Sequence, residues 1–222
     1  AYALGVDIVG NRAYVTYGYF NKGGLQILDI SNPAMITAID SIPFAFVPFK
    51  VRVRGDFAYV AGGGRLTIIN ISGVTTFVSE FSTGFYPLDL DLNDDTLVYL
   101  AESDIFRPSD ISAFTILNVA DPTNTSIAGR RTLLGFVGDV AVSGNLACVA
   151  NMSHGVQMFD VSNPTAPDSI GRYQALGAAG RLFIQDSLLY VADFKYESDF
   201  KSTTQSTSGK TLIEKPGDFQ II

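Results

Sequence analysis

A two-strand pattern recurs along this chain at a near-constant interval. Each copy has an apolar-alternating segment, a tight turn and a second segment that ends in an aromatic residue or cysteine followed by an apolar residue. The copies are VDIVGNRAYV at 6–15, VRVRGDFAYV at 51–60, LDLNDDTLVYL at 90–100, VAVSGNLACV at 140–149 and LFIQDSLLYV at 182–191. Their turns are Gly-Asn, Gly-Asp, Asp-Asp and Asp-Ser pairs, which tolerate the positive φ of a two-residue hairpin. Each copy therefore predicts a β-hairpin.

A second shared element follows four of these hairpins. It is an apolar run that ends in Asp or Asn before a turn, as in GLQILDISNP at 24–33, RLTIINISG at 65–73, AFTILNVADP at 113–122 and GVQMFDVSNP at 155–164. A fourth strand is predicted after each run, at 37–42, 76–81, 126–134 and 168–176. The repeating unit therefore has four strands, and helical periodicity is absent.

The interval between units decides the architecture. The equivalent positions Tyr14, Tyr59, Tyr99, Cys148 and Tyr190 lie 45, 40, 49 and 42 residues apart, with a mean of 44. Four strands at this period are typical of a β-propeller blade, whereas a β-sandwich, the alternative all-β fold, requires no fixed period. We expect an all-β propeller of four-stranded antiparallel blades, with about five repeats. The strands at 5–9, 50–54, 88–92, 139–143 and 181–185 should be innermost.

The predicted blades form one domain over residues 1–222. Their approximate bounds are 1–44, 45–83, 84–134, 135–176 and 177–222. Residues 201–211, KSTTQSTSGKT, have the polar, low-complexity composition of a flexible loop. The segment after that loop predicts a hairpin around Pro216-Gly217-Asp218 that completes the fifth blade; the alternative is a ring truncated from a larger propeller.

Composition excludes several classes of function. The net charge is −7, and Lys and Arg are scattered, so the chain would repel the phosphate backbone of nucleic acid. No apolar run reaches the ~18 residues that a membrane-spanning helix needs. The single cysteine, Cys148, excludes an intramolecular disulfide and is expected to be a buried, inert thiol. The chain begins with Ala1 rather than Met, which fits an exported protein.

The segments GLQILDISNP and GVQMFDVSNP, each following a G-N-x-A-[YC]-V hairpin, resemble the LVIVD repeat. The resemblance covers roughly residues 1–193. Two units match well, and the units at 50–81 and 88–134 depart from the pattern, with Asn70 and Asn118 in place of Asp. Because LVIVD repeats occur mostly in exported or surface proteins of bacteria and archaea, the resemblance implies an extracellular or cell-surface location. The biochemical roles of that family are largely unassigned.

Few residues suggest metal or catalytic chemistry. Asp29, Asn70, Asn118 and Asp160 close the third strands, where they are expected to bond nearby backbone rather than a metal. The calcium candidates are Asp89 and Asp91, although the segment lacks the Gly and Glu of an EF-hand loop. The single histidine, His154, cannot build a transition-metal site by itself and is read as a loop residue. We expect no catalytic triad and no cofactor.

Aromatic residues gather on one predicted face. In four-stranded blades, the loops between strands two and three and the links to the next blade emerge on the same side. This places loops 17–24, 43–49, 102–113, 151–155 and 193–199 on one face, with short turns on the other. Aromatic side chains on loops over a rigid scaffold suit binding of a glycan, a peptide or a protein. The predicted ligand-binding residues are Tyr17, Tyr19, Phe46, Tyr86, Arg107 and Tyr196.

Two functions remain open from the sequence. The first is a non-catalytic binding or scaffold module with its ligand on the aromatic face. The alternative is a propeller-type hydrolase or lyase that uses carboxylates at the channel mouth, such as Asp7, Asp91 and Asp139. Two carboxylates that converge in a pocket would favour the enzyme.

Overall fold

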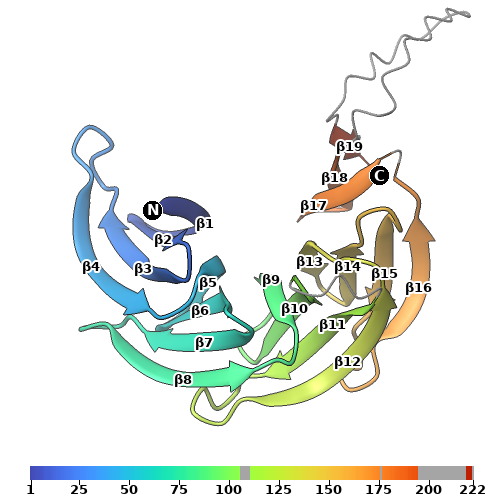
Figure 1. The fold of residues 1–222 in the computed structure, drawn as a ribbon, viewed down its shortest axis with the longest axis horizontal. Coiled ribbons are helices and arrows are strands. Elements are labelled where there is room, and N and C mark those ends of the chain that lie inside the picture. The colour runs from blue at the N-terminus through green and yellow to red at the C-terminus, as the bar shows by residue number, and fades with distance from the viewer. Residues whose placement is uncertain (106–110, 176, 195–218, 222) are drawn as a thin grey trace, which may run out of the picture.

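The computed structural model describes residues 1–105, 111–175, 177–194 and 219–221, so the loop at 201–211 lies outside the described residues. Five separate antiparallel sheets stand side by side in an arc (Figure 1). This confirms the all-β propeller architecture. In the part of the chain that the structure describes, no helix is long and apolar enough to cross a membrane.

Each sheet is a meander whose strands follow chain order, and we call each sheet a blade. Blade 1 contains β1 (Tyr2–Val9), β2 (Arg12–Tyr19), β3 (Lys22–Asp29) and β4 (Thr37–Phe44). Blade 2 contains β5 (Pro48–Arg54), β6 (Phe57–Gly62), β7 (Arg65–Asn70) and β8 (Thr76–Ser82). Blade 3 contains β9 (Tyr86–Leu92), β10 (Leu97–Ser103), β11 (Ile111–Asn118) and β12 (Ser126–Leu134). Blade 4 contains β13 (Asp139–Ser143), β14 (Leu146–Ala150), β15 (Val156–Asp160) and β16 (Asp168–Tyr173). Blade 5 contains β17 (Ala178–Gln185), β18 (Leu188–Phe194) and β19 (Phe219–Ile221).

The first strand of every blade lies innermost, as the repeat predicts. Consecutive inner strands contact one another around the inside of the arc, from β1 to β5, β9, β13 and β17 (Figure 1). The turns between first and second strands have the predicted chemistry, since Gly10, Gly55, Gly144 and Asp186 have φ between 55° and 58°. Glycine adopts this left-handed conformation without the steric cost that a Cβ atom adds.

Apolar layers between consecutive blades hold the arc together. The layer between blades 1 and 2 contains Leu25 and Ile27 on one side and Val51 and Val60 on the other. Leu90 and Val140, the repeat equivalents of Val51, lie in the next two layers. The exposed fractions of Val51, Leu90 and Val140 are 0%, 0% and 2%. Val6, at the same repeat position, is 53% exposed because blade 1 stands at the open end of the arc (Figure 1).

A β-bulge recurs near the start of the inner strands. Pairing skips Leu4 in β1, Phe49 in β5, Leu88 in β9 and Gly180 in β17. A bulge re-aims the residue that it leaves unpaired. Four inner strands therefore present an extra residue at the same level of the arc.

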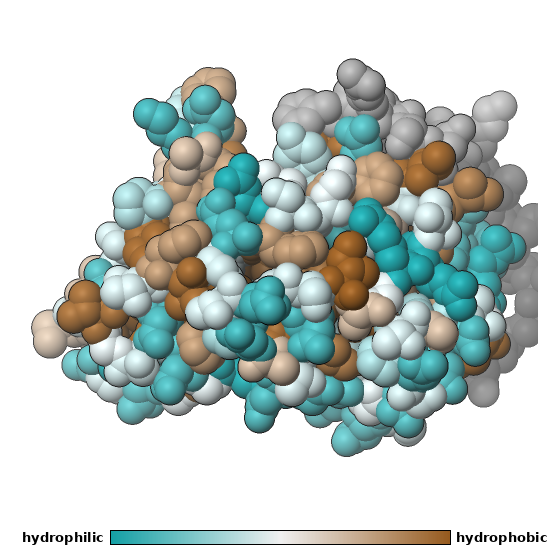
Figure 2. Space-filling view, turned by 90° about the horizontal axis from the view of Figure 1, so that it is seen from below, coloured by the Kyte–Doolittle hydropathy of each residue, from teal (hydrophilic) through white to brown (hydrophobic). Residues whose placement is uncertain are grey.

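The outer rim differs from the seams between blades. Figure 2 shows the arc from the side of β8 and β12, where hydrophilic and hydrophobic residues are interspersed. No continuous apolar band appears on this side. Single apolar side chains of β8 and β12 are exposed, among them Phe77 and Ile127. Single exposed apolar residues are ordinary on a soluble surface.

The residue that ends each third strand caps a turn, as predicted. The side-chain oxygens of Asp29, Asn70, Asn118 and Asp160 each accept a hydrogen bond from the backbone N–H two residues later, at 2.8–2.9 Å. These bonds start the turns that lead to the fourth strands. The hydrogen bonds also lower the pKa values of Asp29 and Asp160.

Asn118→Ala is expected to lower the free energy of unfolding by about 1 kcal/mol, because the N–H of Ala120 loses its acceptor. Asn118→Asp keeps an acceptor oxygen and should retain most of the stability. Urea denaturation followed by circular dichroism measures both variants. Equal losses in the two variants would contradict the capping role.

Candidate functional site

The connections between second and third strands and the links between blades lie on one side of the arc, which we call the upper face. This follows from the meander, because each inner strand runs from a link on this side to a short turn on the other. The upper face therefore carries turns 20–21, 63–64 and 151–155, links 45–47, 83–85 and 135–138, and the described residues 174, 175 and 177 of the link to blade 5. The loops predicted to share one face do so wherever the structure describes them.

A groove of about 360 Å³ opens on the upper face, and we call it the aromatic groove. It is lined by Phe20, Asn21, Ala45, Phe46, Val47, Phe49, Gly63, Tyr86 and Ile105. These residues come from blades 1, 2 and 3, far apart in sequence. Most of the lining is apolar, with the Asn21 amide and the Tyr86 hydroxyl as its polar side-chain groups. Such a lining suits an apolar side chain of a ligand.

Two of the predicted ligand-binding residues line this groove. Phe46 stacks on Phe44 with ring centroids 4.9 Å apart, and the Arg65 guanidinium lies 5.1 Å from its ring centre. Phe46 also packs against Gly63, where a Cβ atom would lie only 2.5 Å from the ring. Tyr86, half-buried at the start of β9, forms another part of the lining. The close approach to Gly63 holds the Phe46 ring in place.

The other predicted residues lie elsewhere. Tyr19 is 53% exposed and packs edge-on against Phe20, with centroids 4.4 Å apart, so it borders the groove without lining it. Tyr17 is half-buried, and its hydroxyl lies against Gly24 in the neighbouring strand. Arg107 and Tyr196 lie outside the described residues.

Phe20 is the lining residue that sequence reasoning undervalued. It is 82% exposed and adopts φ 54° in the turn between β2 and β3. A bulky residue in this conformation is uncommon outside special sites. The sequence signal was the turn itself, in which Phe20-Asn21 stands where Gly or Asp is usual.

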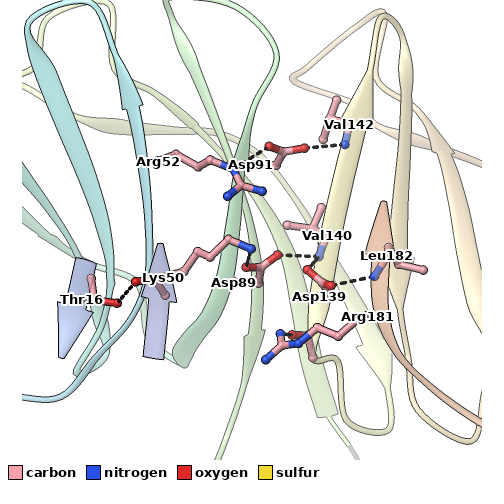
Figure 3. Close-up of polar contacts among 12 residues, drawn as sticks. Thr16, Lys50, Arg52, Asp89, Asp91, Asp139, Val140, Val142, Arg181 and Leu182 are labelled. Carbon is pink, nitrogen blue, oxygen red and sulfur yellow. Dashed lines mark hydrogen bonds and ion pairs between the residues drawn. The ribbon is translucent and has the colours of Figure 1, made fainter. Parts of the chain in front are cut away.

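Inside the arc, carboxylates of one inner strand bond to the backbone of the next. Asp7 accepts from the N–H of Val53 at 2.6 Å, and Asp91 accepts from that of Val142 at 2.9 Å. Nearer the upper face, Asp89 accepts from Val140 and Asp139 from Leu182, at 3.2 and 2.7 Å (Figure 3). Inner strands are sheet edges with unpaired donors. These carboxylates satisfy those donors and tie neighbouring blades together.

Asp89 and Asp139 meet in the buried part of this network. Asp89 is fully buried, and one of its oxygens lies 2.5 Å from the Lys50 ammonium (Figure 3). Burial, reinforced by the Asp89 carboxyl, raises the pKa of Asp139 to about 9. Asp139 therefore keeps its proton at neutral pH, because a second ionised carboxylate beside Asp89 would be buried and repelled.

The channel carboxylates do not form an open acid site. Of the three named for the alternative function, Asp7 and Asp91 are each bonded to a neighbouring blade, and Arg52 pairs with Asp91 at 3.2 Å. Among the carboxylates that the structure describes, Asp139 converges with Asp89, and both are buried. This arrangement favours a structural role for the carboxylates.

The calcium candidates have their oxygens engaged. One oxygen of Asp89 pairs with the Lys50 ammonium, and the other accepts from the N–H of Val140. One oxygen of Asp91 pairs with the Arg52 guanidinium, and the other accepts from the N–H of Val142. Calcium would have to displace two cations. Among the residues that the structure describes, no three His, Cys, Asp or Glu side chains form a group that could hold a metal ion.

Three other titratable side chains, Glu102, His154 and Cys148, have packing roles. Glu102 is fully buried on β10 and pairs at 2.9 Å with Arg130, which also donates to the Thr83 carbonyl in the link to blade 3. Burial raises the pKa of Glu102 to about 7, opposed by Arg130. His154 sits in the turn at 151–155 against Gly135. Cys148 is fully buried, and burial raises the pKa of its thiol to about 11.

Solved structures similar to this chain share its fold. A functionally unknown protein from Desulfotomaculum acetoxidans is 16% identical with a TM-score of 0.70, over 86% of this chain and 65% of that one. The computationally designed Ika8 protein is 9% identical with a TM-score of 0.63, over 86% and 55% of the two chains. The WD40 domain of Neurospora crassa Pan2 is 13% identical with a TM-score of 0.58, over 82% and 56%.

This chain thus spans 55–65% of the length of those three chains. No curated protein matches it. The model of the LVIVD repeat matches residues 2–42, 49–82 and 134–175, which together are more than half of the chain and coincide with blades 1, 2 and 4. The chain belongs to the LVIVD repeat family.

Proposed function

We propose that this chain is a non-catalytic binding module that holds an apolar segment of a peptide or protein in the aromatic groove. The observation that carries the proposal is the groove itself, an open hollow of about 360 Å³ lined by aromatic side chains from three blades. Aromatic anchors that fill or line a pocket contribute much of the energy at protein interfaces.

The chemistry of the lining selects the class of ligand. A glycan presents many hydroxyl groups and needs several side-chain partners, whereas Asn21 and Tyr86 are the residues with polar side chains in the lining of this groove. An aromatic or aliphatic side chain needs apolar contact, which Phe20, Phe46 and Phe49 supply. The Arg65 guanidinium beside Phe46 is paired with the Glu80 carboxylate at 2.9 Å, so the margin carries a matched ion pair.

The hydrogen bonds of the channel carboxylates favour binding over catalysis. A general acid or base must reach the reacting atoms. Asp7, Asp89, Asp91 and Asp139 instead bond to the backbone of the next inner strand. An extracellular or cell-surface location is part of the proposal, and fractionation of the source cells would test it.

Phe46→Ala is expected to weaken binding of groove ligands at least about tenfold, because it removes a central wall of the groove. Probe peptides come from a random phage-displayed library selected on the immobilised chain. Phe77→Ala is the matched control, since Phe77 is 58% exposed on β8 and does not line the groove. Calorimetry measures affinity, and circular dichroism checks the fold.

Tyr19→Ala, a change at an exposed residue beside Phe20, should weaken binding by a smaller factor. Peptides that bind the wild type and Phe46→Ala equally would overturn the proposal. Signals on a glycan array that disappear in Phe46→Ala would instead assign the groove to a glycan.

A further inference from the structure

The recurrent bulges build a second hollow around the centre of the arc, which we call the axial mouth. The bulged residues Leu4, Phe49, Leu88 and Gly180 all line a cavity of about 250 Å³ on the upper face. Phe136, Gly138, Met152, Arg181 and Phe194 complete its lining. The collar of this mouth is therefore largely apolar.

A deeper recess of about 210 Å³ shares part of this lining. Leu4, Phe49, Leu88 and Arg181 border both hollows, and the recess adds Gly5, Val6, Lys50 and Asp89. The axial mouth thus has an apolar collar above a charged floor. Side chains of this floor come from inner strands of different blades, which the bulges hold at one level.

Blades 1, 2, 3 and 5 each give the floor the residue directly after the bulge, and these residues are Gly5, Lys50, Asp89 and Arg181. In blade 4, Asp139 at the start of β13 is buried and does not line the recess. The Lys50 ammonium is matched by Asp89, and Asp139 bonds to the N–H of Leu182 (Figure 3).

Arg181 is the cation of this floor whose charge is not matched. Its guanidinium donates to the carbonyl of Gly138 at 3.3 Å, and no carboxylate lies within 4.0 Å of it among the described residues. Its side chain is exposed to the cavity. A guanidinium presents five N–H donors in a fork that matches a carboxylate, so most of its donors remain for a ligand.

We propose that the axial mouth binds a small organic carboxylate with an apolar body, whose carboxylate pairs with Arg181 while the body lies in the collar. The apolar lining from Leu4, Phe49 and Leu88 excludes water from one side of the ligand. The matched Lys50–Asp89 pair leaves the floor with a surplus of positive charge. The site is separate from the aromatic groove, with which it shares Phe49 alone.

Phenylacetate is the first probe, with phenylacetamide, acetate and inorganic phosphate for comparison. Phenylacetate should raise the melting temperature and bind in a calorimeter, because it has both the anion and the apolar body. Phenylacetamide lacks the charge, acetate lacks the body, and phosphate lacks the body while carrying more charge. All three should bind at least about tenfold more weakly than phenylacetate. Loss of a charge-assisted hydrogen bond lowers affinity by about tenfold or more, and loss of the apolar body removes the contact with the collar.

Arg181→Gln should weaken phenylacetate binding by at least about tenfold. Arg131→Gln is the matched control, because Arg131 pairs with Asp168 on the outer strands. Leu88→Ala should weaken phenylacetate more than acetate. Phe46→Ala should leave phenylacetate binding unchanged, which separates this site from the groove.

Equal binding of phenylacetate to wild type and Arg181→Gln would overturn the proposal, as would equal binding of phenylacetate and phenylacetamide. Phosphate binding that exceeds phenylacetate binding would also overturn it, because the collar would then contribute nothing. Circular dichroism of each variant confirms that lost binding is not lost folding.

Discussion

Val51→Asp is expected to unfold most of the chain at ambient temperature, whereas Val6→Asp leaves it folded. Both valines occupy the same position of the repeat, but Val51 is 0% exposed and Val6 is 53% exposed. Val51 packs among Leu25, Ile27 and Val60 between blades 1 and 2. An aspartate there would be a buried charge without a partner, at a cost of several kcal/mol, roughly 3–5. This approaches the total stability of a typical domain, about 5–15 kcal/mol.

Both variants replace a valine by aspartate at the same repeat position. They differ in burial, because blade 1 covers Val51 whereas no described blade covers Val6. Circular dichroism and urea denaturation of both proteins measure the difference. Similar midpoints for the two variants would mean that blades 1 and 2 do not form the described apolar layer.

Asp139→Asn is expected to make the chain less sensitive to alkaline pH. The pKa of Asp139 is raised from 3.8 to about 9 by burial and by the Asp89 carboxyl. The folded state therefore holds a proton that the unfolded chain releases above about pH 4. The stability that this proton supports is complete below pH 4 and is lost as the pH rises toward 9. Asparagine imitates the protonated acid permanently, because its amide donates to Asp89 and its oxygen can accept from Leu182.

The stability of the variant relative to wild type should therefore increase between pH 5 and pH 8. The expected increase in the free energy of unfolding is at least about 1 kcal/mol. A pKa shift of one unit would already contribute about 1.4 kcal/mol. Asp168→Asn serves as the control, since the Asp168 side chain is 80% exposed. Urea midpoints at several pH values measure the trend. A constant difference between Asp139→Asn and wild type across this range would contradict the raised pKa of Asp139.

Local patterns made much of the fold predictable. Gly10, Gly55 and Gly144 mark turns, and the alternation before and after them specifies strands because side chains of a strand alternate between two faces. Asn118 and its equivalents cap turns through bonds that span only two residues. Such short-range interactions depend on neighbours in sequence, so the sequence alone predicted the blade, the order of its strands and the face that carries the long loops.

The aromatic groove was predictable only in part. Phe46 and Tyr86 followed from the count of aromatic residues on one face, and both line it. Tyr17 belongs to the same face but its hydroxyl packs against Gly24. The direction of each ring depends on its packing partners, Gly63 for Phe46 and Gly24 for Tyr17, which are neighbours in the folded chain and not adjacent in sequence.

The sequence by itself determined the repeat, the blade and the side of the arc on which the hollows open. Only the tertiary structure decided which equivalent residues are buried, as Val51 and Val6 show. Only the tertiary structure brought Asp89 beside Asp139 and left Arg181 without an ion-pair partner among the described residues. The physical reason is that periodicity records the contacts within a blade. Burial, the raised pKa of Asp139 and charge matching arise between blades, from residues about 45 positions apart.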